Sequence, residues 1–84
     1  QGDSMRDAGI RDGDILVVDR SVEPKDRQIV VAMLDGDFTV KRLCKREGKV
    51  FLEAENSAYP PIEVAADSEL VIWGAVTFVI HKPR

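Results

Sequence analysis

The clearest structural signal in the chain is Gln28-Ile29-Val30-Val31-Ala32-Met33-Leu34-Asp35-Gly36-Asp37-Phe38-Thr39-Val40-Lys41-Arg42-Leu43. Asp-Gly between two apolar runs favours a two-residue type I′ turn, because both central positions of that turn need a positive φ. The pattern therefore predicts a β-hairpin with strands over 28–34 and 37–43. Side chains alternate between the two faces of a strand, so Thr39, Lys41 and Leu43 should share one face.

Further short β-type runs lie on both sides of this hairpin, separated by Gly, Asp and Pro. They predict strands over 15–19, 49–55 and 69–81, with a kink or bulge in the last one at Gly74. The loop 56–61 ends in two prolines, which lack N–H donors and should break strand pairing. No sustained 3.6-residue period occurs, so we expect one mainly β domain.

The composition is that of a small globular domain, with 84 residues, 44% apolar and 32% charged. The net charge of −3 argues against sequence-independent binding of nucleic acid by this segment. No apolar run reaches the roughly 18 residues of a membrane span. Cys44 is the single cysteine, so no internal disulfide can form and a reducing compartment is expected. The chain begins at Gln1 without Met, as expected of a processed product or a piece of a longer protein.

Ser4 and Lys41 are the best candidates for hydrolytic chemistry. A serine hydroxyl needs a partner that removes its proton, and a neutral lysine amine can do this without a His–Asp pair. Ser4 lies just ahead of a possible helical turn over 4–8 that Gly9 would stop, so its oxygen could be exposed beside N–H groups that form an oxyanion hole. Lys41 shares a strand face with Leu43, and partial desolvation there would lower its pKa.

Each candidate also has a simpler structural explanation. Serine is common as a helix N-cap, and an exposed position is the usual fate of a strand lysine. His81 has no metal-ligand spacing to another residue and is expected at the surface. Cys44 lies beside a basic run that could lower its pKa, although a structural thiol is the simpler expectation. The basic run itself is expected to be a solvated strand face; it comprises Lys41, Arg42, Lys45, Arg46 and Lys49.

Several aspartates raise the question of a metal site. Their spacing lacks the Asp-x-Asp-x-Asp-Gly ladder with a distal Glu of a calcium loop, so turn and capping roles are expected. We therefore expect no metal and no cofactor. The aspartates in question are Asp3, Asp7, Asp12, Asp14 and Asp19.

In combination, the motifs resemble the self-cleaving Ser–Lys peptidases of the bacterial DNA-damage response, the family of the LexA repressor and UmuD. Lys41 stands 37 positions after Ser4, which is the separation in that family. The resemblance covers nearly the whole chain. It is carried by Gly2-Asp3-Ser4-Met5, Gly9-Ile10, Asp12-Gly13-Asp14, Ile29-Val30-Val31-Ala32, Asp35-Gly36-Asp37, Thr39-Val40-Lys41-Arg42-Leu43, Glu55-Asn56-Ser57-Ala58-Tyr59-Pro60-Pro61-Ile62 and Trp73-Gly74-Ala75-Val76-Thr77-Phe78-Val79-Ile80-His81.

The resemblance implies a role for each site residue. Ser4 would be the nucleophile, Lys41 the general base, and the backbone N–H groups of Asp3 and Ser4 the oxyanion hole. It also implies a fold of curled antiparallel sheets and a bacterial cytoplasmic protein. Asp3 and the tail over 79–84 look more like UmuD and plasmid relatives such as MucA than like LexA. Such proteins cut their own N-terminal arm on a RecA filament, and the trimmed dimer joins a UmuC-type translesion polymerase. The scissile bond of the family lies upstream of Gly2, outside this chain.

Two alternatives stay open at this point. The chain could be the peptidase and dimerisation domain of a LexA-type or phage repressor, whose DNA-binding helices would precede it. It could also be a non-catalytic module for dimerisation and docking. A signal peptidase is less similar, because that class has Pro-Thr after Ser-Met where Arg6-Asp7 follow here. The last strand is apolar on both faces, so we expect a homodimer that pairs or packs these C-terminal strands.

Overall fold

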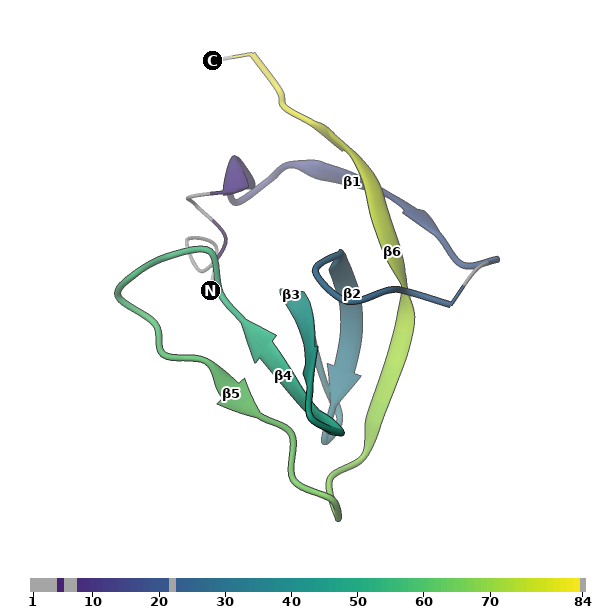
Figure 1. Ribbon diagram of the computed structural model, residues 1–84. Helices are drawn as coiled ribbons and strands as arrows, with labels where there is room; N and C mark the ends of the chain where they lie inside the picture. The colour runs from purple at the N-terminus through teal and green to yellow at the C-terminus, as the bar shows by residue number, and fades with distance from the viewer. Residues whose placement is uncertain (1–4, 6–7, 22, 84) are drawn as a thin grey trace.

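The computed structural model describes residues 5, 8–21 and 23–83 of the chain. In this part of the chain, six strands form one antiparallel sheet in the order β1-β6-β2-β3-β4-β5 (Figure 1). The mainly β prediction is therefore confirmed. The strands are β1 (Ile15–Asp19), β2 (Ile29–Leu34), β3 (Asp37–Arg46), β4 (Lys49–Glu53), β5 (Ile62–Glu63) and β6 (Leu70–Ile80).

The hairpin of β2 and β3 has the turn expected from its sequence. Asp35 and Gly36 both have positive φ, at 50° and 91°, and the register runs from Leu34↔Asp37 to Ile29↔Arg42. A second turn of this kind joins β3 to β4, with φ of 50° at Glu47 and 77° at Gly48. That turn was not expected, because Glu-Gly is a weaker signal than Asp-Gly. Strand β3 accordingly continues to Arg46, three residues beyond its expected end at Leu43.

Other expected boundaries differ from the structure at the ends of the elements. Strand β4 stops at Glu53, two residues before the expected end, and the short β5 directly follows Pro61 and pairs with β4. Near the start of the described chain, the N–H of Ala8 donates to the carbonyl of Met5 at 3.0 Å, and Gly9 follows with φ of 81°. This is the end of the expected single turn; residues 4, 6 and 7 lie outside the described residues.

Strand β6 is continuous through the irregularity expected at Gly74. Its register with β2 passes from Val31↔Gly74 to Ala32↔Ile72, so Trp73 is the extra residue of a bulge. A Cβ atom on Gly74 would lie 2.5 Å from the carbonyl oxygen of Asp19. Glycine therefore allows the backbone of β1 to approach this point of β6.

Among the described residues, β6 occupies an interior position in the sheet, between β1 and β2. The two ladders are staggered, since β2 pairs with residues 70–75 and β1 with residues 75–80. Among the described residues, the segment 76–80 therefore has a ladder on one side only. The sequence of a strand indicates which of its faces are apolar. Its position in the sheet depends on which other strands pair with it, and these are distant in the sequence.

The core is aliphatic and lies on one face of the sheet. Val30, Ala32, Leu43 and Leu52 are buried to 1% exposure or less. Lys41 is paired with Val30 and Leu43 is paired with Leu52, so this face includes Lys41. Partly buried side chains surround the four; they are Leu34, Val50, Val64, Leu70 and Ile72.

The described residues contain no helix with the length and apolar character needed to cross a membrane.

Candidate functional site

Lys41 lies in the middle of β3 on the core face of the sheet. Its Nζ donates a hydrogen bond to Thr39 Oγ1 at 2.7 Å, and the carbonyl oxygen of Val40 lies 3.4 Å from the same nitrogen. The side chain is partly buried, and this desolvation lowers the pKa of Lys41 from its ordinary value of 10.5. Partial desolvation, expected from the shared face with Leu43, is confirmed. A partly dehydrated lysine amine of lowered pKa can act as a general base.

Thr39 is a site residue whose role was not recognised from the sequence. The alternation of β3 already placed it on the face of Lys41, two positions away. Its hydroxyl accepts from Nζ and so restricts the direction of the amine. The sequence does place this polar residue two positions before Lys41. Polar residues are common in strands, however, and whether one contacts its neighbour depends on its side-chain rotamer.

The candidate nucleophile and its oxyanion hole lie outside the described residues, since Asp3 and Ser4 are not among them. Met5, the residue after Ser4, is described and is only 2% exposed. Its carbonyl accepts from the N–H of Ala8 at 3.0 Å and of Ile10 at 3.3 Å. The backbone directly after the candidate serine is thus anchored in the protein interior, while the capping and nucleophilic roles of Ser4 both stay predictions.

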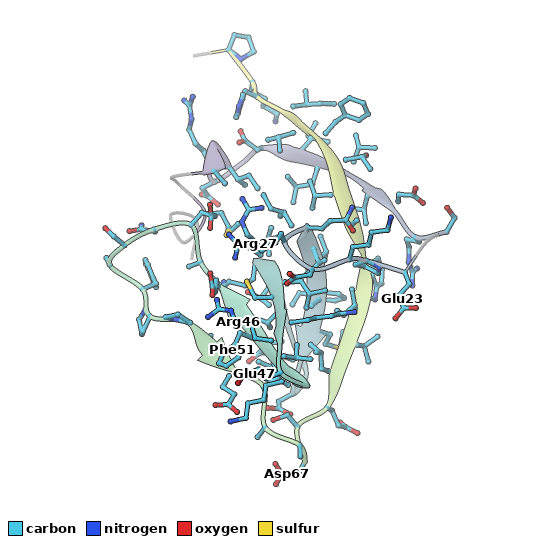
Figure 2. The ribbon with its side chains drawn as sticks, in the orientation of Figure 1. Glu23, Arg27, Arg46, Glu47, Phe51 and Asp67 are labelled. Atoms are coloured by element: carbon cyan, nitrogen blue, oxygen red, sulfur yellow. The ribbon has the colours of Figure 1, made fainter. Side chains whose placement is uncertain are left out.

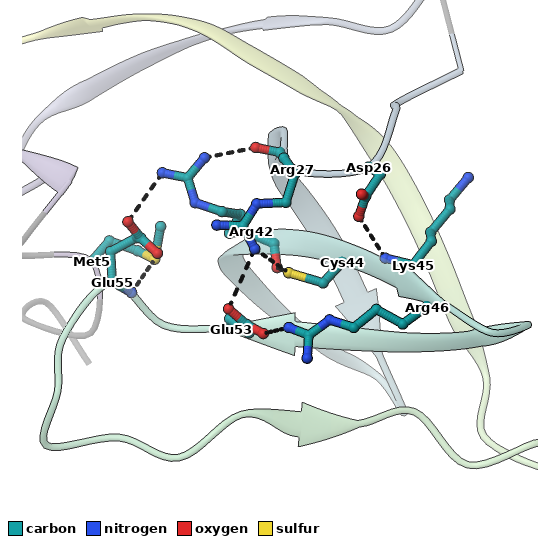
Figure 3. Close-up of polar contacts among 9 residues, drawn as sticks. All are labelled: Met5, Asp26, Arg27, Arg42, Cys44, Lys45, Arg46, Glu53 and Glu55. Carbon is teal, nitrogen blue, oxygen red and sulfur yellow. Dashed lines mark hydrogen bonds and ion pairs between the residues drawn. The ribbon is translucent and has the colours of Figure 1, made fainter.

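Five charged side chains gather together, and we call them the arginine–glutamate cluster (Figure 3). Figure 2 shows two of them, Arg27 and Arg46, within the whole molecule. Strand alternation and pairing put Arg42, Arg46 and Glu53 on the face of the sheet opposite Lys41. Arg42 bonds Glu55, with Nη2 3.1 Å from Oε1, and Arg46 bonds Glu53. Arg27 lies 3.7 Å from Glu53. The basic run expected to be a solvated face is therefore partly ion-paired, since it includes Arg42 and Arg46. The cluster is Arg27, Arg42, Arg46, Glu53 and Glu55.

The acidic half of this cluster was not foreseen from the sequence. The Glu47-Gly48 turn sets a register in which Arg42 is opposite Glu53, so recognising that turn would have predicted a charged cross-strand pair. The hydrogen bond from Arg42 is the main cause of a lowered pKa at Glu55. Glu55 is therefore ionised at neutral pH.

Cys44 is fully buried beneath this cluster, and Nη1 of Arg27 lies 3.2 Å from its Sγ. Burial is the main cause of a raised pKa for this thiol, and Glu53 adds to it. A structural thiol is therefore confirmed, and the alternative of a lowered pKa is wrong. The nearby cations do not outweigh the loss of water around the sulfur.

Asp14 and Asp19 serve turns, as expected. Asp14 accepts from the N–H of Arg11 at 2.7 Å, which is the main cause of its lowered pKa. Asp19 accepts from the N–H and the hydroxyl of Ser21. In the part of the chain with described coordinates, no three metal-ligating side chains come together. Asp3 and Asp7 fall outside that part.

His81 follows β6 directly and is exposed, as expected for a surface residue. Its Nδ1 lies 2.8 Å from Oδ2 of Asp14, so the end of β6 is tied to the turn before β1.

The Peptidase S24-like family description matches residues 1–77, a segment that includes both Ser4 and Lys41. The chain belongs to this family. The LexA repressor of Shewanella piezotolerans is 49% identical over 83 residues, which are 98% of this chain and 40% of the relative. LexA repressor 1 of Xanthomonas oryzae pv. oryzae is 51% identical over 82 residues, or 98% and 41% of the two chains. Protein ImpA of Salmonella typhimurium is 42% identical over 83 residues, or 99% and 56%.

These comparisons confirm the resemblance drawn from the motifs, at the level of the LexA/UmuD family. The Peptidase S24-like family is one of self-cleaving serine peptidases. This S24-like chain spans about two fifths of the length of the LexA repressors and 56% of ImpA. ImpA is therefore shorter than the Shewanella LexA repressor, because a matched segment of 83 residues makes up 56% of ImpA and 40% of that repressor.

Proposed function

We propose that this chain is the Ser–Lys self-cleaving peptidase domain of a bacterial DNA-damage response protein. Ser4 is the nucleophile and Lys41 the general base. The observation that carries the proposal is the position of Lys41, which is partly buried on the core face with a lowered pKa. Membership of the Peptidase S24-like family supports it, because the matched segment contains both residues.

The chemistry follows from a neutral lysine amine. Lys41 Nζ accepts the proton of the Ser4 hydroxyl as Oγ attacks the carbonyl carbon of the scissile peptide. The backbone N–H groups of Asp3 and Ser4 donate to the oxyanion that forms. The ammonium of Lys41 then protonates the leaving amine, and water hydrolyses the acyl-enzyme with Lys41 again as base. The hydroxyl of Thr39 holds Nζ in place by accepting from it.

For the parent protein we propose a UmuD-like role, in which a RecA filament stimulates removal of an N-terminal arm and the trimmed dimer joins a UmuC-type polymerase in translesion synthesis. Asp3 and the tail over 79–84 favour this reading. A LexA-type repressor is the second candidate, because the LexA repressors reach 49–51% identity against 42% for ImpA. An upstream stretch of about a hundred residues with a helix-turn-helix pattern would identify a repressor, and a short arm without one a UmuD-like protein.

The self-cleavage test uses the parent protein, which carries its natural N-terminal arm. Addition of RecA, single-stranded DNA and a nucleoside triphosphate should produce two fragments, and Ser4→Ala should abolish them. Ser57→Ala is the matched control, since Ser57 is exposed in a loop, and it should cleave at the normal rate. Cleavage that persists in Ser4→Ala contradicts the dyad. A wild-type protein that never cleaves, even at alkaline pH, supports the non-catalytic docking module instead.

We propose a homodimer that forms through the C-terminal half of β6. Residues 76–80 pair with β1 on one side, and β2 does not extend along their other side. Phe78, 68% exposed, and Ile80, 49% exposed, add apolar surface to this segment. Sedimentation at high micromolar concentration should give the mass of a dimer, and Phe78→Asp should shift it toward monomer. A monomeric wild-type protein at that concentration would rule the interface out.

A further inference from the structure

The segment after β4 contacts the residue that follows the candidate nucleophile. Beyond Glu53 the chain leaves the sheet, and the backbone N–H of Glu55 lies 3.4 Å from Sδ of Met5 (Figure 3). The Met5 side chain is buried to 2% exposure, so this contact lies in the protein interior. The backbone of Glu55 therefore contacts the buried side chain of Met5 directly.

Arg42 holds that segment through the carboxylate of Glu55. Nη2 of Arg42 lies 3.1 Å from Oε1 of Glu55, and Nη1 donates to the carbonyl of Arg27 at 2.6 Å. The two paired side chains are only 22% and 28% exposed, so water screens the pair less than it screens a surface ion pair. The planar guanidinium can point its two nitrogens at both partners at once, which a lysine ammonium cannot do in the same geometry.

We infer that the Arg42–Glu55 ion pair positions the backbone carrying Ser4 relative to Lys41. Arg42 directly follows Lys41 in β3, and Met5 directly follows Ser4. The contacts thus run from Arg42, the residue after Lys41, to the side chain of Glu55, and from the backbone of Glu55 to the side chain of Met5. Arg42 and Glu55 are positioning residues, because they act through Met5 and touch no reacting atom. The catalytic part of this inference rests on the proposed function, whereas its geometric part does not.

A neighbouring pair in the same cluster provides the matched control. Glu53 is two residues before Glu55, bonds Arg46 and is 17% exposed at its side chain, whereas the hydrogen bond to Met5 comes from Glu55. Removing the charge of Glu53 costs its ion pairs with Arg46 and Arg27, and it leaves the contacts from Arg42 to Glu55 and from Glu55 to Met5 in place. Glu55→Gln and Glu53→Gln therefore separate loss of positioning from loss of charge.

The geometric part is tested by methyl NMR on the parent protein labelled at methionine methyls. Met5 and Met33 signals are assigned by Met5→Leu and Met33→Leu. Glu55→Gln and Arg42→Gln should each move or broaden the Met5 signal and leave the Met33 signal in place. Glu53→Gln should move neither. An unchanged Met5 signal in both Glu55→Gln and Arg42→Gln overturns the inference, whatever the protein does as an enzyme.

The catalytic part is tested by the rate of self-cleavage as a function of pH. Glu55→Gln should lower the limiting rate at high pH by roughly 10- to 100-fold, since small displacements of reacting groups have effects of that order. The pH midpoint should stay that of the wild type, because it belongs to Lys41. Glu53→Gln should keep the limiting rate within about twofold. The double variant Arg42→Gln/Glu55→Gln should be no slower than the slower single variant, as expected for two residues of one pair.

The outcomes separate failure of this inference from failure of the proposed dyad. Equal rate losses in Glu55→Gln and Glu53→Gln, or a loss that follows the melting temperature, overturn the positioning role. Cleavage that survives Ser4→Ala instead refutes the dyad, and the Met5 signal then still decides whether the ion pair fixes this segment.

Discussion

Replacing Lys41 by alanine is expected to slow self-cleavage of the parent protein by about 10²–10⁴-fold, the usual contribution of a general base. The same change should remove the increase of the rate with pH. In the wild type only the neutral amine can accept the serine proton, so the rate should rise through the pKa of Lys41 and then level off. Desolvation lowers this pKa, so the rise should lie below pH 10.5, the ordinary lysine value.

The matched control for this prediction is Lys45→Ala. Lys45 lies on the same strand and the same face, carries the same charge and is exposed. It should cleave at close to the wild-type rate, with the wild-type pH midpoint. A Lys41→Ala protein that keeps the normal rate and pH profile would show that another group is the base. Single-turnover cleavage followed by gel electrophoresis from pH 6 to pH 11 is the measurement.

The lowered pKa of Lys41 also links stability to pH. Between the folded pKa and 10.5, the unfolded chain binds more protons at this position than the folded chain does. The contribution of Lys41 to the free energy of unfolding therefore increases with pH over that window, and below it the buried charge lowers stability. The burial that lowers the pKa of Lys41 therefore also lowers the free energy of unfolding at neutral pH.

The largest loss of stability is expected for Leu52→Ala. Leu52 is fully buried in β4, opposite Leu43 in β3 and beside Ile62 in β5. Removing its side chain should lower the free energy of unfolding by about 3–5 kcal/mol, because packed neighbours close such a cavity only partly. Small domains have total stabilities of about 5–15 kcal/mol, so much of the protein should unfold at moderate urea concentration. Urea titration followed by Trp73 fluorescence measures the change.

The control for Leu52→Ala is Val71→Ala. Val71 also lies in a strand, but 54% of its surface is exposed. This change should alter the free energy of unfolding by no more than about 1 kcal/mol, mostly through lower strand propensity. Comparable losses in the two variants would mean that the buried cluster around Leu52 is not the main source of stability.

The elements that sequence predicted well are those with local causes. Asp35-Gly36 fixed a turn because positive φ at two successive positions is a property of those residues. Gly74 marked the bulge because a glycine inside a strand pattern commonly accompanies one. The extension of β3, the short β5 and the central place of β6 were not foreseen. Each of these depends on pairing with a distant segment, and apolar alternation does not specify the partner.

In the candidate site, too, the features with local causes were predictable and those that depend on distant segments were not. Alternation alone placed Lys41 on the face of Leu43, from which its desolvation follows. The pairing of Arg42 with Glu55 was not predictable from alternation, because Glu55 lies beyond the end of β4, where strand geometry no longer applies. The contact between Arg27 and Cys44 was not predictable either, because Arg27 comes from the loop before β2.

The place of β1 in the sheet has a consequence for the order of folding. Strands β2, β3 and β4 are joined by two-residue turns and can form on a microsecond timescale, like isolated hairpins. Strand β1 pairs only with β6, and Ile15 is opposite Ile80 at the far end of the described chain. Closing so long a loop costs the most entropy, so we expect β1 to dock last and to separate first. Met5 and Ile10 lead into β1, so the backbone beside the candidate nucleophile is expected to assemble late as well.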